Sequence, residues 1–210
     1  MGSSASFYLA AAGVGKLGLV DSDCVTRNNL NRQIVHHQGS LGQPKVISAK
    51  NTLQKLNPYL DYVLYNEEFT PENGLRIAEN YDLIVDATDN VDAKFVINEV
   101  CATLKKPNIY GVANTYEGRV SVFNYQNGPC LACLFSKGFS DPDAFVAVLG
   151  TVPGLIGTLQ ANEAIKIILG FDEILSGRLL IFNAKESSFK ELTILKNEAC
   201  PICHHETRRV

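Results

Sequence analysis

Apolar strand-like runs alternate with helix-like segments along the first half of this chain, and this alternation most restricts the folds open to it. The apolar run at residues 83–85 shows no polar alternation, as is typical of a strand buried on both faces of a parallel sheet. Later in the chain, apolar residues alternate with polar ones at Val120, Val122 and Tyr125, which predicts a half-exposed strand. We therefore expect an α/β fold with a mostly parallel sheet that antiparallel strands extend.

Turn and cap residues set the bounds of the predicted elements. Gly13 and Gly15 end a first helix, Asn57-Pro58 ends a second, and Gly170 ends the last. The predicted helices are those that begin at Gly2, Pro44, Thr70, Val91 and Val152. The predicted strands lie near residues 17–20, 62–65, 83–85, 108–113, 120–125, 178–182 and 190–195.

The chain has 210 residues, which is close to the size of one domain with a single hydrophobic core. Its formal net charge of −3 argues against a nucleic-acid partner. No apolar run reaches the roughly 18 residues of a membrane-spanning helix. The apolar stretch 6–14 has no Lys or Arg before it, unlike a secretory signal peptide. We expect a cytoplasmic protein that acts on neither nucleic acids nor membranes.

Four of the six cysteines form two CxxC pairs with 66 residues between them, namely Cys130 with Cys133 and Cys200 with Cys203. Each pair can present two sulfurs to one ion, and four thiolates satisfy the tetrahedral geometry of structural zinc. Two redox-active pairs are the alternative, and His204 or His205 could replace a ligand. We favour structural zinc, which would tie the carboxyl-terminal end to the loop after the central strands.

Two residues near the amino terminus have a spacing that nucleotide-binding folds use. Gly2 opens a predicted helix, and Asp21 follows the next predicted strand 19 residues later. At this separation an acidic residue meets a ribose hydroxyl in such folds. An aspartate after a strand is also common as a helix cap or turn former, so the spacing alone leaves both roles open.

The loop after Asp21 concentrates amides and a cation, and a second cation follows it. Asn28, Asn29, Arg32 and Gln33 lie in this loop, and Lys45 stands at the start of the next predicted helix. An arginine grips phosphate oxygens in a planar fork and a lysine supplies a compact charge, so the set could neutralise a triphosphate. On charge alone, a solvated loop fits equally well.

Polar residues also follow the buried strand at residues 83–85. Asp86, Asp89 and Asn90 stand at its carboxyl end, where open α/β sheets bind ligands. Asp89 could hold magnesium, which binds oxygen ligands and bridges phosphates. For Asp86 we expect instead that it caps the following helix.

Six strings, in order along essentially the whole chain, resemble the ThiF/MoeB/HesA family of adenylating enzymes, which are related to the ubiquitin-activating enzymes: GSSASFYLAAAGVGKLGLVDSD, NNLNRQ, GQPK, DATDN, GPCLAC and ACPIC. The resemblance implies a Rossmann-like fold with structural zinc. It also implies an ATP site made of Gly2, Asp21, Asn28, Asn29, Arg32, Gln33, Lys45, Asp89 and Asn90. In such a site Asp21 binds the ribose, and Asn29, Arg32, Gln33 and Lys45 surround the phosphates.

Members of this family activate the terminal carboxylate of a ubiquitin-like sulfur carrier as an acyl-adenylate and release pyrophosphate. The resemblance implies the same reaction here, by a homodimer, on the small subunit of molybdopterin synthase or the thiamine sulfur carrier. A carboxylate is already ionised near pH 7, so the barrier lies mainly in charge and alignment at the α-phosphate. Arg32, Lys45 and a magnesium ion near Asp89 are therefore the expected catalytic groups.

Two departures from the family pattern bear on activity. Of the family's GxGGxG loop only the last glycine, Gly2, is present, and the first strand and an amino-terminal arginine that reaches the partner's nucleotide have no counterpart. Because the downstream polar motifs are intact, we expect the written start to lie inside a longer reading frame. Val146 stands where some members carry a cysteine that links to the carrier, so the pattern does not support that linkage.

We expect one domain over residues 1–210, with a nucleotide-binding part at 1–125 and a part at 126–210 that holds the crossover loop, the carrier-binding surface and the zinc site. Two other functions stay open. A catalytically silent, zinc-stabilised carrier-binding protein would explain the incomplete phosphate loop. A dinucleotide-dependent oxidoreductase fits Gly2 and Asp21 but leaves Arg32, Lys45 and the CxxC pairs unexplained.

Overall fold

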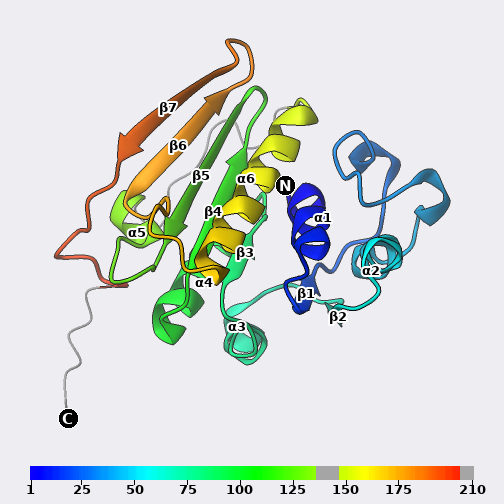
Figure 1. Ribbon diagram of the computed structural model, residues 1–210, viewed down its shortest axis with the longest axis horizontal. Helices are drawn as coiled ribbons and strands as arrows, with labels where there is room; N and C mark the ends of the chain where they lie inside the picture. Colours follow the sequence, from blue (N-terminus) through cyan, green and yellow to red (C-terminus); the bar gives the residue numbers. More distant parts are fainter. Residues whose placement is uncertain (136–146, 204–210) are drawn as a thin grey trace.

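The computed structural model describes residues 1–135 and 147–203 (Figure 1). Val146, His204 and His205 therefore lie outside the described residues. The helices are α1 (Gly2–Ala12), η1 (Arg27–Asn29), η2 (Gln38–Ser40), α2 (Lys45–Leu56), α3 (Pro71–Ala78), α4 (Val91–Leu104), α5 (Leu131–Leu134) and α6 (Thr151–Ile168). The strands are β1 (Lys16–Val20), β2 (Asp61–Tyr65), β3 (Ile84–Asp86), β4 (Asn108–Ala113), β5 (Glu117–Phe123), β6 (Arg178–Asn183) and β7 (Ser188–Thr193).

The described strands form two sheets. One sheet is the parallel pair of β1 and β2. The other begins with the parallel pair of β3 and β4 and continues through antiparallel β5, β6 and β7 in that order. This arrangement confirms the α/β class with an antiparallel extension, and within the described chain parallel pairing is confined to β1–β2 and β3–β4.

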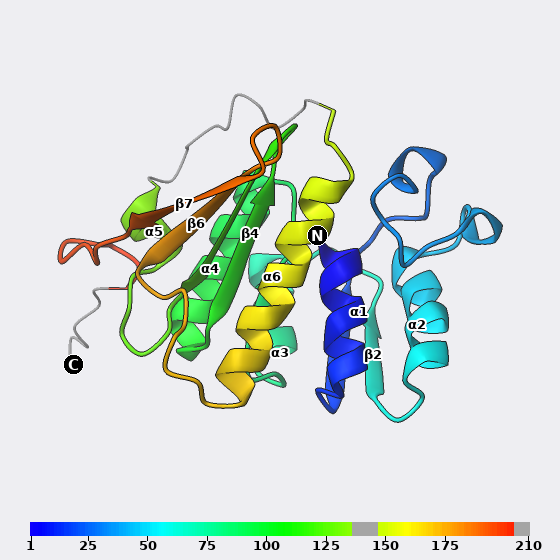
Figure 2. The ribbon, with the colours of Figure 1, turned by 45° about the horizontal axis from the view of Figure 1, so that its top comes forward.

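Helices cover both faces of the larger sheet near β4 and β5. Neighbouring residues of β4 point to opposite faces, since Ile109 packs with Ile156 of α6 whereas Tyr110 packs with Phe95 of α4 and Leu131 of α5. Figure 2 shows α6 running across one face of this sheet with α1 beside it. The carboxyl ends of β3 and β4 consequently open between α6 and α4, as ligand sites in α/β sheets do.

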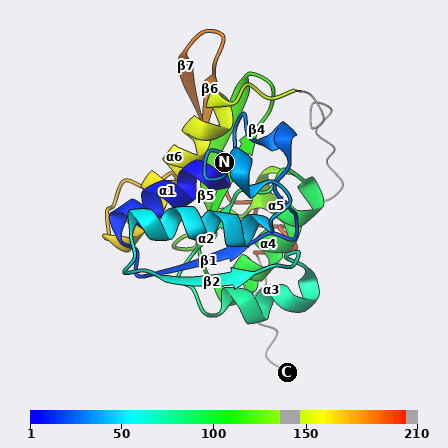
Figure 3. The same cartoon turned by 90° about the vertical axis from the view of Figure 1, so that its right-hand side faces the viewer.

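The smaller sheet is covered by α1 and α2. Its core contains Ala10, Leu53 and Tyr62, and Figure 3 shows both helices lying along β1 and β2. The other side of β1 is filled by Tyr81, because a Cβ built on Gly18 would come within 2.4 Å of the Tyr81 hydroxyl oxygen. Glycine at this position thus allows the ring to lie against the strand.

Two helix ends show which residues terminate the helices. The Asn90 side chain accepts a hydrogen bond from Ala93 N at 2.9 Å, which caps α4. After α6, Gly170 adopts a left-handed conformation with a φ of 71°, as expected for a glycine that ends a helix. In the described part of the chain no helix combines the length and apolarity needed to cross a membrane.

Candidate functional site

A cavity of ≈ 320 Å³ lies at the carboxyl ends of β3 and β4. Among the described side chains that line it, three are cationic and one is acidic, namely Arg32, Lys94, Arg119 and Asp89. Phe95 and Tyr110 belong to its apolar wall. A cavity with this balance of charge favours an anionic ligand that also carries apolar or uncharged groups.

Three of the residues that the sequence singled out line this cavity: Arg32, Gln33 and Asp89. The Arg32 guanidinium donates to the backbone oxygen of Asn28 and to the side-chain oxygens of Asn29 and Asn31, each at 3.1 Å. Asn28 and Asn29 therefore hold the arginine, and the short helix η1 supplies both. The arginine is positioned by its own loop before any ligand arrives.

Lys45 belongs to a second polar cluster, outside the lining of the cavity. Its ammonium lies 2.7 Å from an oxygen of Asp23 and 3.3 Å from an oxygen of Asp21. Burial works to lower the pKa of Lys45, but the hydrogen bonds that its ammonium donates to Asp23 and Asp21 and the charges of both aspartates raise it above its ordinary value. The cation is fixed in its charged form, and both carboxylates are engaged with it.

Asp23 is a member of this cluster that sequence reasoning missed. Its backbone N–H donates to Asp21 at 2.9 Å, and its backbone oxygen accepts from Lys45 N at 2.9 Å. The available signal was the Asp-x-Asp string directly after the predicted strand. In a turn, two acids at this spacing lie close together.

The expectation that Asp86 caps the helix after it is wrong. Asp86 is 0% exposed, and its carboxylate accepts from the Lys94 ammonium at 3.1 Å and from the Thr88 hydroxyl at 2.7 Å. As the last residue of β3, Asp86 points into the sheet–helix interior, so Asn90 takes the capping position instead. Lys94 itself was overlooked, although a lysine on the helical stripe of Ile97 and Cys101 is a visible signal.

Gly2 and Asn90 lie at the edges of this region. A Cβ built on Gly2 would come within 3.4 Å of the Cβ of Ala87, a residue that lines the cavity. Asn90 follows Asp89 and uses its side-chain oxygen to cap α4. The structure thus brings Gly2, Arg32, Gln33, Asp89 and Asn90 to the cavity or its rim, while Asp21 and Lys45 form the separate cluster with Asp23.

The four cysteines of the CxxC pairs meet at α5, which Cys130 precedes and which contains Cys133. Their sulfur atoms all lie within 4.8 Å of one another. Sγ–Sγ distances are 3.6 Å between Cys130 and Cys200, 3.4 Å between Cys133 and Cys203, and 3.9 Å between Cys130 and Cys133. A tetrahedral zinc ion with bonds of about 2.3 Å requires about 3.8 Å between its sulfurs. The donor set and its dimensions therefore fit a closed zinc site.

The surroundings of these cysteines favour a thiolate at Cys200. Burial works to raise the pKa of the Cys200 thiol, but the backbone N–H groups of Cys203 and Ile202 and the neighbouring thiols outweigh it and lower the pKa to about 7. In contrast, burial raises the pKa of Cys101, a core residue that is 0% exposed, to about 12. Cys24 is exposed in its loop.

Comparison with known proteins gives matches over nearly the whole chain. The ThiF family matches residues 1–202. The adenylyltransferase and sulfurtransferase MOCS3 of Culex quinquefasciatus is 44% identical over 209 residues, which cover 97% of this chain and 48% of that protein. The sulfur carrier protein adenylyltransferase of Thermus thermophilus is 39% identical over 208 residues, which cover 95% and 77% of the two chains. The chain thus spans about half the length of the MOCS3 protein that it matches.

Solved structures share the fold. The crystal structure of E. coli MccB with AMPCPP and MccA has a TM-score of 0.86 at 19% identity, over 97% of this chain and 63% of that one. MccB with ATP gives a TM-score of 0.84 at 19% identity, over 96% and 63%. At this identity the likeness establishes the arrangement of helices and strands alone.

Proposed function

This chain belongs to the ThiF family, and we propose that it adenylates the terminal carboxylate of a ubiquitin-like sulfur-carrier protein with ATP and releases pyrophosphate. The observation that carries the proposal is the cationic cavity at the carboxyl ends of β3 and β4, lined by Arg32, Gln33 and Asp89. The names of the relatives, adenylyltransferase in both cases, support the same activity.

The residues of the cavity suit a reaction that needs charge rather than a base. The carboxylate oxygen attacks the α-phosphorus, the bond to the bridging oxygen breaks, and its electron pair leaves with pyrophosphate. Arg32 stabilises the charge that moves onto the leaving group. Lys45 joins it by exchanging the Asp23 carboxylate for phosphate oxygens, which the flexible stem of a lysine allows.

The remaining site residues hold the nucleotide or hold those that do. Asp21 is assigned to the ribose, and Asn28 and Asn29 keep Arg32 in place. The exposed carboxylate of Asp89, an oxygen donor at the cavity, fits magnesium, which when bound supplies positive charge to the phosphates. Gly2 and Asn90 complete the rim through their backbone and amide groups.

The cysteine cluster is proposed to hold structural zinc and to have no part in the reaction. Four sulfurs fill the coordination of the ion and leave no position for a substrate. Thiolates of this kind persist in a reducing compartment, which supports the cytoplasm as the place of action. The nucleotide part at residues 1–125 and the zinc and carrier part at 126–210 then serve one homodimeric enzyme.

ATP–pyrophosphate exchange tests the activity. The probes are the purified small subunit of molybdopterin synthase and the thiamine sulfur carrier, each with a free terminal carboxylate. We expect one of them to drive exchange, and the same carrier with a carboxyl-terminal amide to drive none. Carrier binding without exchange would indicate a silent binding protein and contradict the proposal, as would hydride transfer to a dinucleotide.

A further inference from the structure

Lys94 is a buried cation on the wall of the cavity, and neither the sequence motifs nor the reaction described above uses it. It lies on α4 and is 5% exposed. Its ammonium donates to Asp86 at 3.1 Å and to the backbone oxygen of Gly111 at 2.7 Å, and it lies 5.1 Å from the centre of the Tyr110 ring. Two oxygens and an aromatic face thus surround the ammonium group of this lysine in the interior.

The ammonium has donor capacity left for a ligand. A lysine has three N–H groups, and in the described part of the chain two of them have protein partners. Lys94 is at the same time part of the cavity lining. A buried N–H group that borders a cavity can form its hydrogen bond with a ligand in that cavity.

Lys94 stands where the charged and the apolar walls of the cavity meet. The α-amino group of Met1, also in the cavity, has its pKa lowered to about 6 by burial and then by the charges of Arg32 and Lys94, with Asp89 opposing them. Arg32, Lys94 and Asp89 all line the same cavity as this amino group. On the other side, Tyr110 beneath the ammonium belongs to the apolar cluster of Phe95 and Leu131.

We propose that the Lys94 ammonium binds the carboxylate that is activated, at the boundary between the nucleotide wall and the apolar wall of the cavity. This proposal rests on the proposed adenylation and names the residue that receives the second substrate. The apolar wall contacts the uncharged carboxyl-terminal segment of the carrier. Arg32 binds the phosphates, and Asp89 binds their metal ion. Lys94 holds one carboxylate oxygen, and the other oxygen is left to attack the α-phosphorus.

A purely structural role would be to neutralise Asp86. That carboxylate is fully buried, one of its oxygens has no partner in the described residues, and Lys94 supplies the positive charge beside the other oxygen. Lys94→Met alone would leave a buried unpaired charge and lower the Tm whatever else the lysine does. The double variant Lys94→Met/Asp86→Asn removes both charges and separates the two roles.

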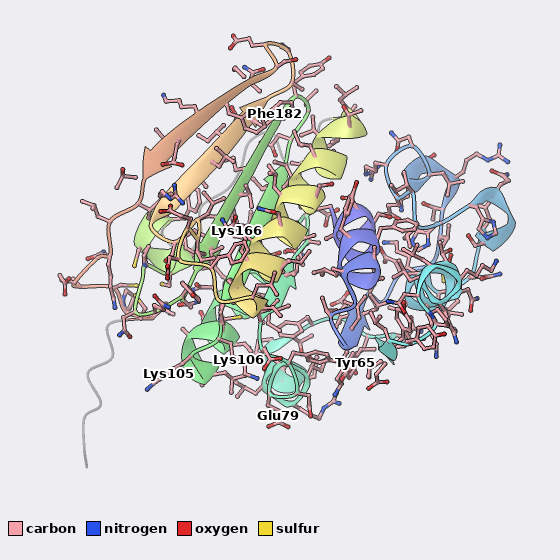
Figure 4. The ribbon with its side chains drawn as sticks, in the orientation of Figure 1. Tyr65, Glu79, Lys105, Lys106, Lys166 and Phe182 are labelled. Atoms are coloured by element: carbon pink, nitrogen blue, oxygen red, sulfur yellow. The ribbon has the colours of Figure 1, made fainter. Side chains whose placement is uncertain are left out.

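A buried pair elsewhere in the chain supplies the control. The Lys166 ammonium lies 2.7 Å from Glu163, whose side chain is 3% exposed, and both residues belong to α6 and lie outside the cavity lining. Lys166 is labelled in Figure 4. Lys166→Met/Glu163→Gln removes the same kind of pair. We expect this control to keep the KM for the carrier and the KM for ATP of the unmodified enzyme.

The experiment measures carrier-dependent ATP–pyrophosphate exchange and, separately, equilibrium binding of the carrier without ATP. For Lys94→Met/Asp86→Asn we expect the KM and the Kd for the carrier to rise about 10- to 100-fold, as for a lost charge-assisted contact, while the KM for ATP stays within about 2-fold. Lys94→Arg should recover part of the loss, because it keeps the charge.

Wild-type affinity for the carrier in the double variant would overturn the proposal, since neutralising Asp86 would then be the whole role of Lys94. A rise in the KM for ATP alone would also overturn it. Absence of exchange in the unmodified protein would instead count against the proposed adenylation, and the binding measurement would still decide the role of Lys94.

Discussion

The cysteine cluster and the Asp21–Asp23–Lys45 cluster gather charged groups in opposite ways. The four sulfurs come from two segments far apart in the chain, yet they lie within 4.8 Å of one another. In the second cluster the cation already has two carboxylates within 3.3 Å. The sulfurs are arranged to bind a metal ion permanently. The lysine, in contrast, must break an ion pair with an aspartate to bind a phosphate group.

This difference predicts where stability and activity reside. Four thiolates at short distance repel one another, so their arrangement depends on a metal and metal binding becomes folding free energy. The lysine is already paired with two aspartates, largely or partly exposed, without any ligand, so the fold tolerates changes there more easily than the reaction does. Changes in the two clusters should therefore affect different measurements.

The largest effect is expected from breaking the cysteine cluster. Cys133→Ser removes one ligand, and we expect loss of bound zinc and a fall in Tm of about 10 °C or more, because several kcal/mol are lost at about 2–4 °C per kcal/mol in a chain of this size. Metal analysis and thermal unfolding measure both quantities. The control is Cys24→Ser, at an exposed thiol outside the cluster. Equal Tm values for the two variants would contradict a structural metal.

Removal of Lys45 should show the opposite pattern. Lys45→Ala is expected to lower carrier-dependent pyrophosphate exchange about 100- to 1000-fold, the usual loss when a group that stabilises transition-state charge is deleted. We expect its Tm to change by no more than a few degrees. Lys55→Ala, in the last turn of α2, is the matched control and should keep full exchange. A loss of stability without loss of exchange would assign Lys45 a structural role.

Asp23→Asn sharpens the comparison, because it removes one of the two carboxylates that compete with phosphate for Lys45. We expect the KM for ATP to fall about 2- to 5-fold, which corresponds to the worth of an ion pair with a largely exposed partner. Steady-state kinetics at low ionic strength measures it. Asp82→Asn, at another exposed acid, should have no effect, and a higher KM in Asp23→Asn would mean that Asp23 aids nucleotide binding.

The smallest effect concerns His36, which donates to or accepts from the Ser48 hydroxyl at 2.9 Å. Burial and then the charge of Lys45 lower its pKa below the ordinary value, so the folded state disfavours the protonated ring. Its contribution to stability is present above pH 6.5 and is lost as the pH falls below that value. Between pH 8 and pH 5, the Tm of His36→Gln should therefore fall less than the Tm of the unmodified protein. An unchanged pH dependence would contradict this assignment.

The sequence was most informative where the chemistry depends on local spacing. Two CxxC pairs are typical of one shared zinc ion, and they can bind one ion only if their loops lie close together. The motif therefore predicted the cysteine cluster. The family strings likewise indicated the α/β class and the residues at the carboxyl end of β3. The exact partners of the charged residues were beyond reach, because Lys94 finds Asp86 and Gly111 only when α4 packs on β3 and β4.

The role of Asp86 also could not be predicted from the sequence. A polar residue after an apolar strand has two common uses, in a cap or in the interior, and the choice depends on which way the strand end faces. The Asp23 carboxylate is a similar case, since the Asp-x-Asp string reveals two acids but not the lysine that begins α2. Pairing across elements is a property of packing, and one chain read alone contains no measure of it.

The absence of a side chain at Gly157 has a consequence for how this protein could change over time. A methyl group there would come within 2.2 Å of both the Met1 backbone oxygen and the Ser4 hydroxyl, so α1 would have to shift along α6. The first turn of α1 adjoins Ala87, which lines the cavity. Any such shift would therefore change the shape of the cavity without changing the charged residues that line it. Natural variants at this remote glycine should therefore be rarer among active enzymes than variants at many positions nearer the chemistry.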